Sequence, residues 1–78
     1  MKWISEILKK DNRLFVEVRG RETVLAEGYC SIELYTPEKI ILNNGEYAVS
    51  IEGENLELRH LSSVVMAIDG RIDRLEFV

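Results

Sequence analysis

Residues 47–58 read YAVSIEGENLEL, and hydrophobic side chains occupy every second position on both sides of Gly53. A period of two puts successive side chains on opposite faces of a β-strand. Gly53 interrupts the alternation, and glycine permits the positive φ angles of a tight hairpin turn. This stretch therefore predicts two short antiparallel strands joined at Gly53.

Turn-forming residues recur about every eight positions along most of the chain, a spacing that suits strands of about 5 to 7 residues and is too short for helices. They are Gly20, Gly28, Thr36-Pro37, Asn43-Asn44-Gly45, Gly53, Ser62-Ser63 and Gly70. The spacing predicts a mainly β fold of about eight short antiparallel strands in a meander, curled into a small barrel or a two-layer sandwich. A β-solenoid with two strands in each 17-residue rung is the alternative.

The segment from residue 29 to residue 35 shows which side chains face the core. Cys30, Ile32 and Leu34 share one parity and predict a buried face. Tyr29 and Tyr35 share the other parity with polar residues, so we expect them on the surface, covered by a second layer of the domain or exposed for protein contact. Residues 40–42 and 64–68 are apolar on both parities, which predicts either central strands covered on both faces or strands whose outer face is buried by a partner.

A short motif recurs three times: a β-branched residue, a charged residue, glycine and another charged residue. Its copies are Val18-Arg19-Gly20-Arg21, Ile51-Glu52-Gly53-Glu54 and Ile68-Asp69-Gly70-Arg71. We interpret the three glycines as hairpin tips. The recurrence fits either an internal repeat or a meander of uniform strands.

Residues 1–12 differ from the rest and predict a short amphipathic helix, whereas residues 13–78 predict a single small β domain. Trp3, Ile4, Ile7 and Leu8 have helical spacing, and residues 1–10 carry three Lys and one Glu. A helix this short is marginal alone, so its apolar stripe must dock. The stripe could dock on one of three surfaces: the sheet of the same chain, a partner protein or a membrane.

Composition limits the function classes. The chain has 78 residues and a net charge of −4, and acidity of this kind argues against a nucleic-acid partner. Charged residues interrupt every apolar run, so neither a signal peptide nor a membrane span is expected. The single cysteine suits a reducing compartment. These features predict a cytoplasmic protein.

Catalytic chemistry has few candidate residues. Cys30 is the only cysteine and His60 the only histidine. We expect Cys30 to act as a small buried hydrophobe and His60 to lie at a strand end on the surface. No zinc spacing, calcium loop or phosphate-binding glycine loop is present in the sequence, so no catalytic, metal or cofactor residue is predicted. A small ligand-binding or enzymatic barrel with a site near Cys30 and His60 remains the alternative.

Glycine and hydrophobic positions from about residue 14 to residue 77 resemble the YabP/YqfC family of sporulation proteins. The strongest part is Ile51-Glu52-Gly53-Glu54-Asn55-Leu56, followed by Ile68-Asp69-Gly70-Arg71-Ile72. The resemblance implies a small β protein made during endospore formation, with no known reaction and no catalytic residue to carry over. It also implies a protein partner, such as a sporulation membrane protein, which would place this protein at a membrane indirectly.

Together these observations predict a non-enzymatic structural or protein-interaction module. Its expected partner-binding residues are Trp3, Ile7, Tyr29 and Tyr35. Unpaired strand edges would also allow a homo-oligomer.

Overall fold

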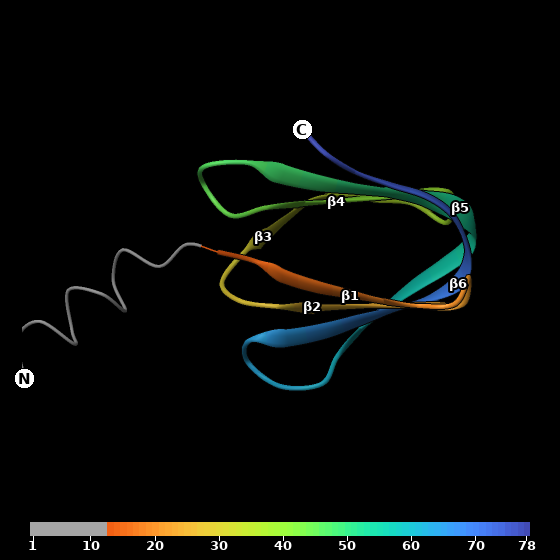
Figure 1. Ribbon diagram of the computed structural model, residues 1–78, viewed down its shortest axis with the longest axis horizontal. Coiled ribbons are helices and arrows are strands. Elements are labelled where there is room, and N and C mark those ends of the chain that lie inside the picture. Colours follow the sequence, from red (N-terminus) through yellow and green to blue (C-terminus); the bar gives the residue numbers. More distant parts are fainter. Residues whose placement is uncertain (1–12) are drawn as a thin grey trace, which may run out of the picture.

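The structure is a computed structural model that describes residues 13–78. Six strands form one antiparallel sheet in the order β1-β2-β6-β5-β4-β3 (Figure 1). They are β1 (Phe15–Arg19), β2 (Thr23–Glu27), β3 (Ser31–Tyr35), β4 (Lys39–Asn43), β5 (Ala48–His60) and β6 (Val65–Phe77). The mainly β prediction is confirmed. The expected helix of residues 1–12 lies outside the described residues.

The count of about eight strands is wrong because β5 and β6 are each 13 residues long. Gly53 and Gly70 lie inside these strands and are not hairpin tips. A Cβ on Gly53 would lie 1.8 Å from the carbonyl oxygen of Arg71, so glycine is required by the close approach of two backbones. Glycine is also required at position 70, because the φ there is +137° and a Cβ would lie 2.6 Å from the carbonyl oxygen of Asn55.

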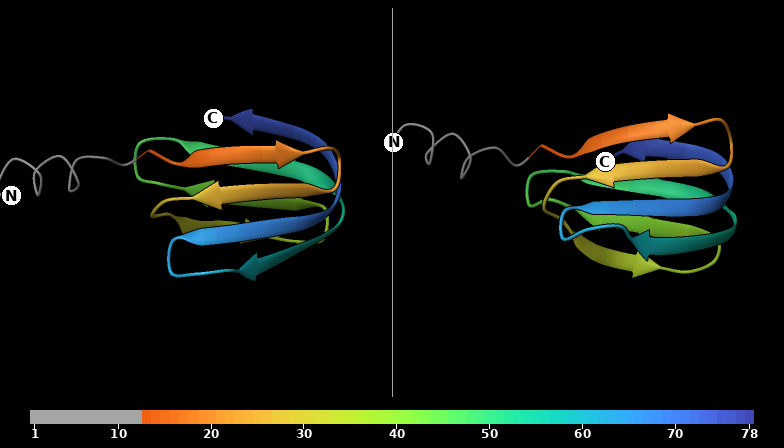
Figure 2. Two further views of the ribbon diagram at one scale, coloured as in Figure 1. Left: turned by 60° about the horizontal axis from the view of Figure 1, so that its bottom comes forward. Right: turned by 90° about the horizontal axis from the view of Figure 1, so that it is seen from below.

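The two long strands bend together near these glycines. Their pairing shifts register between Glu52 and Gly53 and again between Glu54 and Glu57, and Asn55 has a φ of +54°. Bulges of this kind bend a strand and increase its twist. The sheet consequently folds over on itself into two facing layers (Figures 1 and 2).

Each long strand belongs to both layers. One layer contains β1, β2, the first half of β6 and the last residues of β5, and the other contains β3, β4, the first half of β5 and the last residues of β6. In a simple meander β2 would pair with β3, the next strand in the sequence. Here β2 pairs with β6 instead, so the meander is interrupted once. The sheet is open, which corrects the closed-barrel alternative, and its antiparallel pairing excludes a solenoid of stacked parallel rungs.

The other turn signals are confirmed. Gly20 lies in the β1–β2 turn with a φ of +60°. In the β3–β4 turn, the Thr36 hydroxyl accepts a hydrogen bond of 2.9 Å from the Lys39 N–H. In the β4–β5 turn, the Asn44 side-chain oxygen accepts bonds from the N–H groups of Glu46 and Tyr47. Such local side-chain bonds stabilise turns.

The hydrophobic core fills the space between the layers. Residues 40 and 42 of β4, 49 and 51 of β5 and 68 of β6 are fully buried there, as is Val24 of β2. β4 and β6 each have a strand on both sides, so both apolar runs belong to interior strands as expected. All described residues with buried side-chain polar atoms have hydrogen-bond partners for those atoms.

The arrangement has an approximate two-fold relation. β4 pairs with the first half of β5 as β2 pairs with the first half of β6. The Gly53 N–H donates a hydrogen bond to the carbonyl oxygen of Glu38 in the β3–β4 turn. In the same way, the Gly70 N–H donates to the carbonyl oxygen of Glu22 in the β1–β2 turn. Two of the three sequence motifs thus lie at matching bends, and the third, Val18–Arg21, lies at a hairpin tip.

Candidate functional site

The outer faces of the two layers carry charged rows of side chains. Glu52 on β5 lies 3.7 Å from Lys39 on β4 and 3.8 Å from Arg74 on β6. On the other layer, Asp69 accepts a bond of 2.6 Å from Arg59 and one of 3.1 Å from Thr23. The Arg59 hydrogen bond is the main reason that the pKa of Asp69 lies below its ordinary value. These faces are solvated, so apolar contact surfaces must be sought at the edges of the layers.

The two layers meet along two open edges, which we call seams. The first seam lies between β1 and residues 72–77 of β6, and the second seam lies between β3 and residues 57–60 of β5. Each seam is crossed at a tyrosine. The Leu14 N–H donates to Tyr47 Oη at 2.9 Å beside the first seam, and the Leu58 N–H donates to Tyr35 Oη at 2.9 Å across the second.

All five residues of β3 are exposed, which corrects the expectation that Ile32 and Leu34 share a buried face. The pairing of β3 with β4 shifts register between Ile32 and Leu34, so Tyr35 faces the buried Ile40 and has the inward orientation expected for Leu34. Ile32 faces the buried Leu42, yet it is 41% exposed because no strand covers this edge. The exposed side chain of Ile32 therefore lies where the hydrophobic core is open to solvent.

One end of the second seam forms a hollow of about 160 Å³. Its lining joins the β2–β3 connection to the β5–β6 turn and is mostly apolar. The lining residues are Gly28, Tyr29, Cys30, Ile32, His60, Ser63, Val64 and Met66. The structure therefore brings Cys30 and His60 to one depression, as the ligand-site alternative expected.

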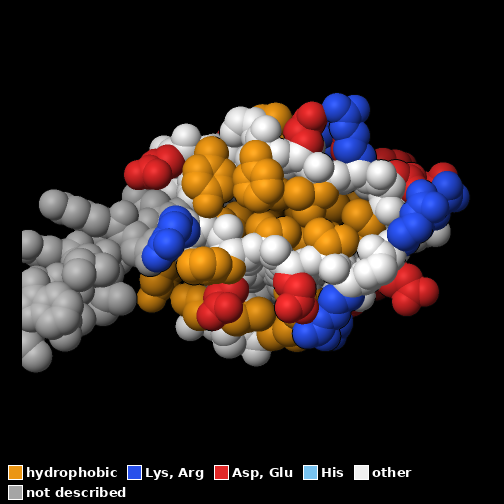
Figure 3. Space-filling model, in the orientation of Figure 1, with side chains coloured by type: hydrophobic (Ala, Val, Ile, Leu, Met, Phe, Trp, Pro, Cys, Tyr) orange, Lys and Arg blue, Asp and Glu red, His pale blue; other side chains and the backbone are white. Residues whose placement is uncertain are grey.

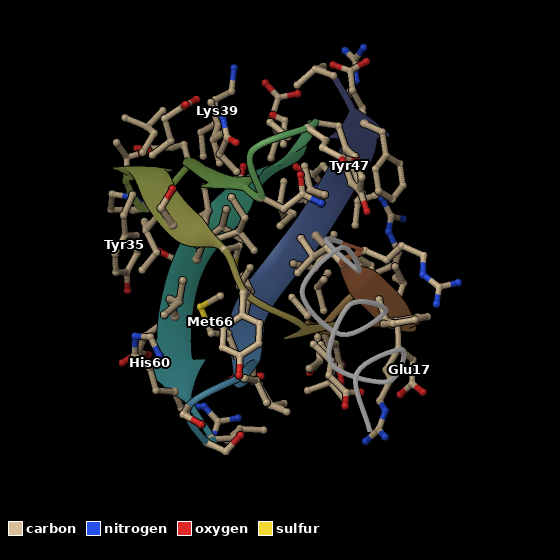
Figure 4. The ribbon with its side chains drawn as sticks, turned by 90° about the vertical axis from the view of Figure 1, so that its left-hand side faces the viewer. Glu17, Tyr35, Lys39, Tyr47, His60 and Met66 are labelled. Atoms are coloured by element: carbon tan, nitrogen blue, oxygen red, sulfur yellow. The ribbon has the colours of Figure 1, made fainter. Side chains whose placement is uncertain are left out.

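His60 and Met66 are register partners on β5 and β6, and they lie on neighbouring strands at this end of the molecule (Figure 4). Met66 is buried, whereas His60 is exposed at the rim. Cys30 is half-buried, and its burial raises the pKa of the thiol. A raised pKa keeps a thiol protonated at neutral pH, where it is a poor nucleophile.

No group of three or more His, Cys, Asp or Glu side chains within residues 13–78 is placed to hold a metal ion. The polar side chains of the hollow are those of His60, Ser63 and Tyr29. The hollow therefore has an apolar lining and a polar rim, a combination typical of small binding pockets, and it is suited to binding an apolar group.

Tyr29 lines the hollow and is 80% exposed, so no second layer of the described residues covers it, and its role in partner contact stays a prediction. Tyr35 is 48% exposed, but its hydroxyl is engaged by Leu58, so it also holds the second seam together. The other two expected contact residues, Trp3 and Ile7, lie outside the described residues.

The first seam was not anticipated. Val18 and Phe77 point toward the core, because they pair with the fully buried Val24 and Val49, yet they are 50% and 58% exposed. Figure 3 shows hydrophobic side chains as a band between the layers on this face. The alternation of β1 places Val18 inward, but sequence alone does not indicate that β1 is an edge strand.

The described residues thus define a small all-β protein with one folded antiparallel sheet, charged outer faces and apolar seams. Residues 10–78 match the model of the YabP family, and the chain belongs to that family. Family membership suggests a sporulation-related protein. No curated protein and no solved structure matches the chain. Within residues 13–78, no helix has the length and hydrophobicity needed to span a bilayer.

Proposed function

We propose that this protein is a non-enzymatic interaction module of endospore formation, which binds a segment of another protein along β3. The observation that supports the proposal most directly is the combination of a free edge strand with the apolar hollow beside it. A free edge offers unpaired N–H and C=O groups to an extended segment. The hollow offers a place for one side chain of that segment.

The hollow suits a single apolar anchor. A cavity of about 150 Å³ accepts a group of the size of benzene, so a hollow of about 160 Å³ has room for one aliphatic or aromatic side chain. Ile32, Val64 and Met66 would contact that side chain, and Tyr29 would cover its outer side. Binding energy at protein interfaces is commonly concentrated in such anchors.

Charge indicates the chemistry of the partner. Glu27 and Glu33 lie on either side of the β2–β3 connection that lines the hollow, and residues 22–38 contain neither lysine nor arginine. An acidic surface favours a segment with Lys or Arg beside its apolar anchor. Cytoplasmic loops of membrane proteins are rich in these residues. We therefore propose a cytoplasmic location, with attachment to a membrane through a sporulation membrane protein.

The alternative is a small ligand-binding or enzymatic site at Cys30 and His60. It has support from the shared hollow. The raised pKa of the Cys30 thiol disfavours nucleophilic chemistry, whereas it does not affect a role in packing. We therefore favour the interaction module.

Three variants made in a spore-forming host would separate the two functions. Ile32→Asp places a charge at the edge of the hollow, and Phe15→Asp is a matched control, because Phe15 is an exposed apolar residue of β1 that does not line the hollow and pairs with the exposed Glu27. Cys30→Ser tests the chemical alternative. With protein levels equal by immunoblot, we expect Ile32→Asp to reduce spore yield strongly and the other two variants to leave it near the parental level.

A photo-crosslinker placed at residue 32 should also capture a membrane protein during sporulation, whereas one placed at residue 54 on the charged surface should not. Loss of spore yield in Cys30→Ser with normal yield in Ile32→Asp would overturn the interaction module and favour the site at Cys30 and His60.

A further inference from the structure

The first seam leaves part of the core uncovered on the face shown in Figure 3. Val18 and Phe77 have inward register positions but are about half exposed. The half-buried Val16 and Leu75 pack against the core at the same two edges. Exposed apolar side chains grouped in this way are typical of a contact surface.

The chain itself enters the β-sheet at this seam. Leu14 is buried directly before β1, and its N–H donates to Tyr47 Oη. The ring of Tyr47 lies 5.8 Å from that of Phe77, measured between centroids. The described part of the chain therefore begins at the end of the first seam, close to the exposed aromatic ring of Phe77.

The sequence of residues 1–12 fits the seam in pattern and length. Trp3, Ile4, Ile7 and Leu8 share one face if the segment is helical. A helix of the six residues 3–8 would be about 9 Å long, which fits within the roughly 17 Å over which the five residues of β1 extend. Asp11 and Asn12 are turn-forming residues, which would allow the chain to reverse direction before Arg13.

Charge and tethering favour this segment over a separate molecule. Residues 13–78 contain seven Lys and Arg against twelve Asp and Glu, a net charge of −5, whereas residues 1–12 contain three Lys against one Glu and one Asp, a net charge of +1. A short tether also gives the segment an effective concentration on the order of millimolar at the seam.

We infer that residues 3–8 of this chain fold back as an amphipathic turn of helix and cover the first seam, with Trp3 against the core beside Phe77. The site is separate from β3 and its hollow. The inference therefore stands or falls independently of the proposed function.

Trp3 is the only tryptophan, so its fluorescence reports directly on this contact. In the protein of residues 1–78 we expect a blue-shifted emission maximum of Trp3 and protection of its ring from acrylamide quenching. Val18→Asp and Phe77→Ser should each shift the emission to the red and raise the quenching constant severalfold. Ile32→Asp, on the second seam, is the matched control and should change neither value. Far-UV circular dichroism would verify that each variant retains its β-sheet.

The dependence of Trp3 emission on protein concentration and on lipid distinguishes residues 3–8 from a second copy of the chain and from a membrane. The emission should stay constant over a hundredfold dilution and on addition of vesicles that contain anionic phospholipid. A solvent-exposed Trp3 in the parental protein, or protection that persists in both seam variants, would overturn the inference. Protection lost on dilution would assign the seam to a second copy, and protection gained only with vesicles would assign the segment to a membrane.

Discussion

Gly53 lies so close to Arg71 that a Cβ at position 53 would be 1.8 Å from the Arg71 carbonyl oxygen. The atom in the way belongs to the backbone of the neighbouring long strand, so no side-chain rotation can relieve the contact. This approach allows β5 and β6 to bend together.

Gly53→Ala should therefore destabilise the protein by about 3 kcal/mol or more, the range of a severe steric substitution. Gly20→Ala is the control, because Gly20 has a φ of +60° but open space around its Cβ position. We expect that change to cost about 1 kcal/mol through backbone conformation alone. Urea denaturation of both variants would measure the difference. Equal free energies of unfolding would contradict the steric account of the bend.

Tyr47→Phe should destabilise the protein by about 1 to 2 kcal/mol, because it leaves the part-buried N–H of Leu14 without its acceptor. Tyr35→Phe removes the corresponding bond to Leu58 in an exposed setting, so a cost of about 0.5 kcal/mol is expected. Thermal denaturation of the two variants would establish the order. A larger loss in Tyr35→Phe would mean that the second seam, and not the first, limits stability.

Asp69 should contribute to the acid sensitivity of the fold. Its pKa is lowered in the folded protein, first by the hydrogen bond from Arg59, below the value of about 3.9 expected in the unfolded chain. The stabilising contribution is therefore fully present above about pH 4 and is lost as the pH falls through the folded-state pKa.

Asp69→Asn should lower the free energy of unfolding at pH 7, and its difference from the parental protein should shrink as the pH falls below 4. Urea denaturation at pH values from 3 to 7 would measure this. A difference that is independent of pH would show that the carboxylate charge is not responsible.

Cys30 should react slowly with alkylating reagents. Burial raises the pKa of its thiol, so less thiolate is present at neutral pH than in an unstructured peptide, whose thiol pKa is about 8.5. The rate of iodoacetamide modification, followed from pH 7 to pH 10, should be shifted to higher pH in the native protein. The same measurement in urea supplies the control. Faster modification of the native protein would instead favour the chemical role of Cys30 and His60.

The sequence predicts much of the fold because each tight turn has its own local chemistry. The signals at Gly20, Thr36 and Asn44 correspond to real turns. Gly53 and Gly70 were misassigned, since a tight turn and a close approach of two strands both require glycine. The alternation around them continues on either side of the bend, so nothing local distinguishes one long bent strand from two short ones.

The candidate site was predictable only in part. Tyr29 is exposed as its position suggests. The bulge after Ile32 reverses the alternation, so Tyr35 turns inward, and no sequence signal marks such an insertion. The hollow depends on contact between residues about 30 positions apart, and the first seam depends on which strands lie at the edges. The hollow and the first seam both follow from the order of the strands in the sheet, which the local sequence pattern does not specify.

The sharing of β5 and β6 between the two layers has a consequence for how the protein loses its structure. Neither layer possesses a complete set of strands of its own, so one half cannot melt while the other survives. We expect a single cooperative transition in calorimetry, with the slowest amide exchange in the middle of these two strands. The edge strands β1 and β3 can fray without global unfolding, which leaves the seams as the parts of the molecule most open to rearrangement.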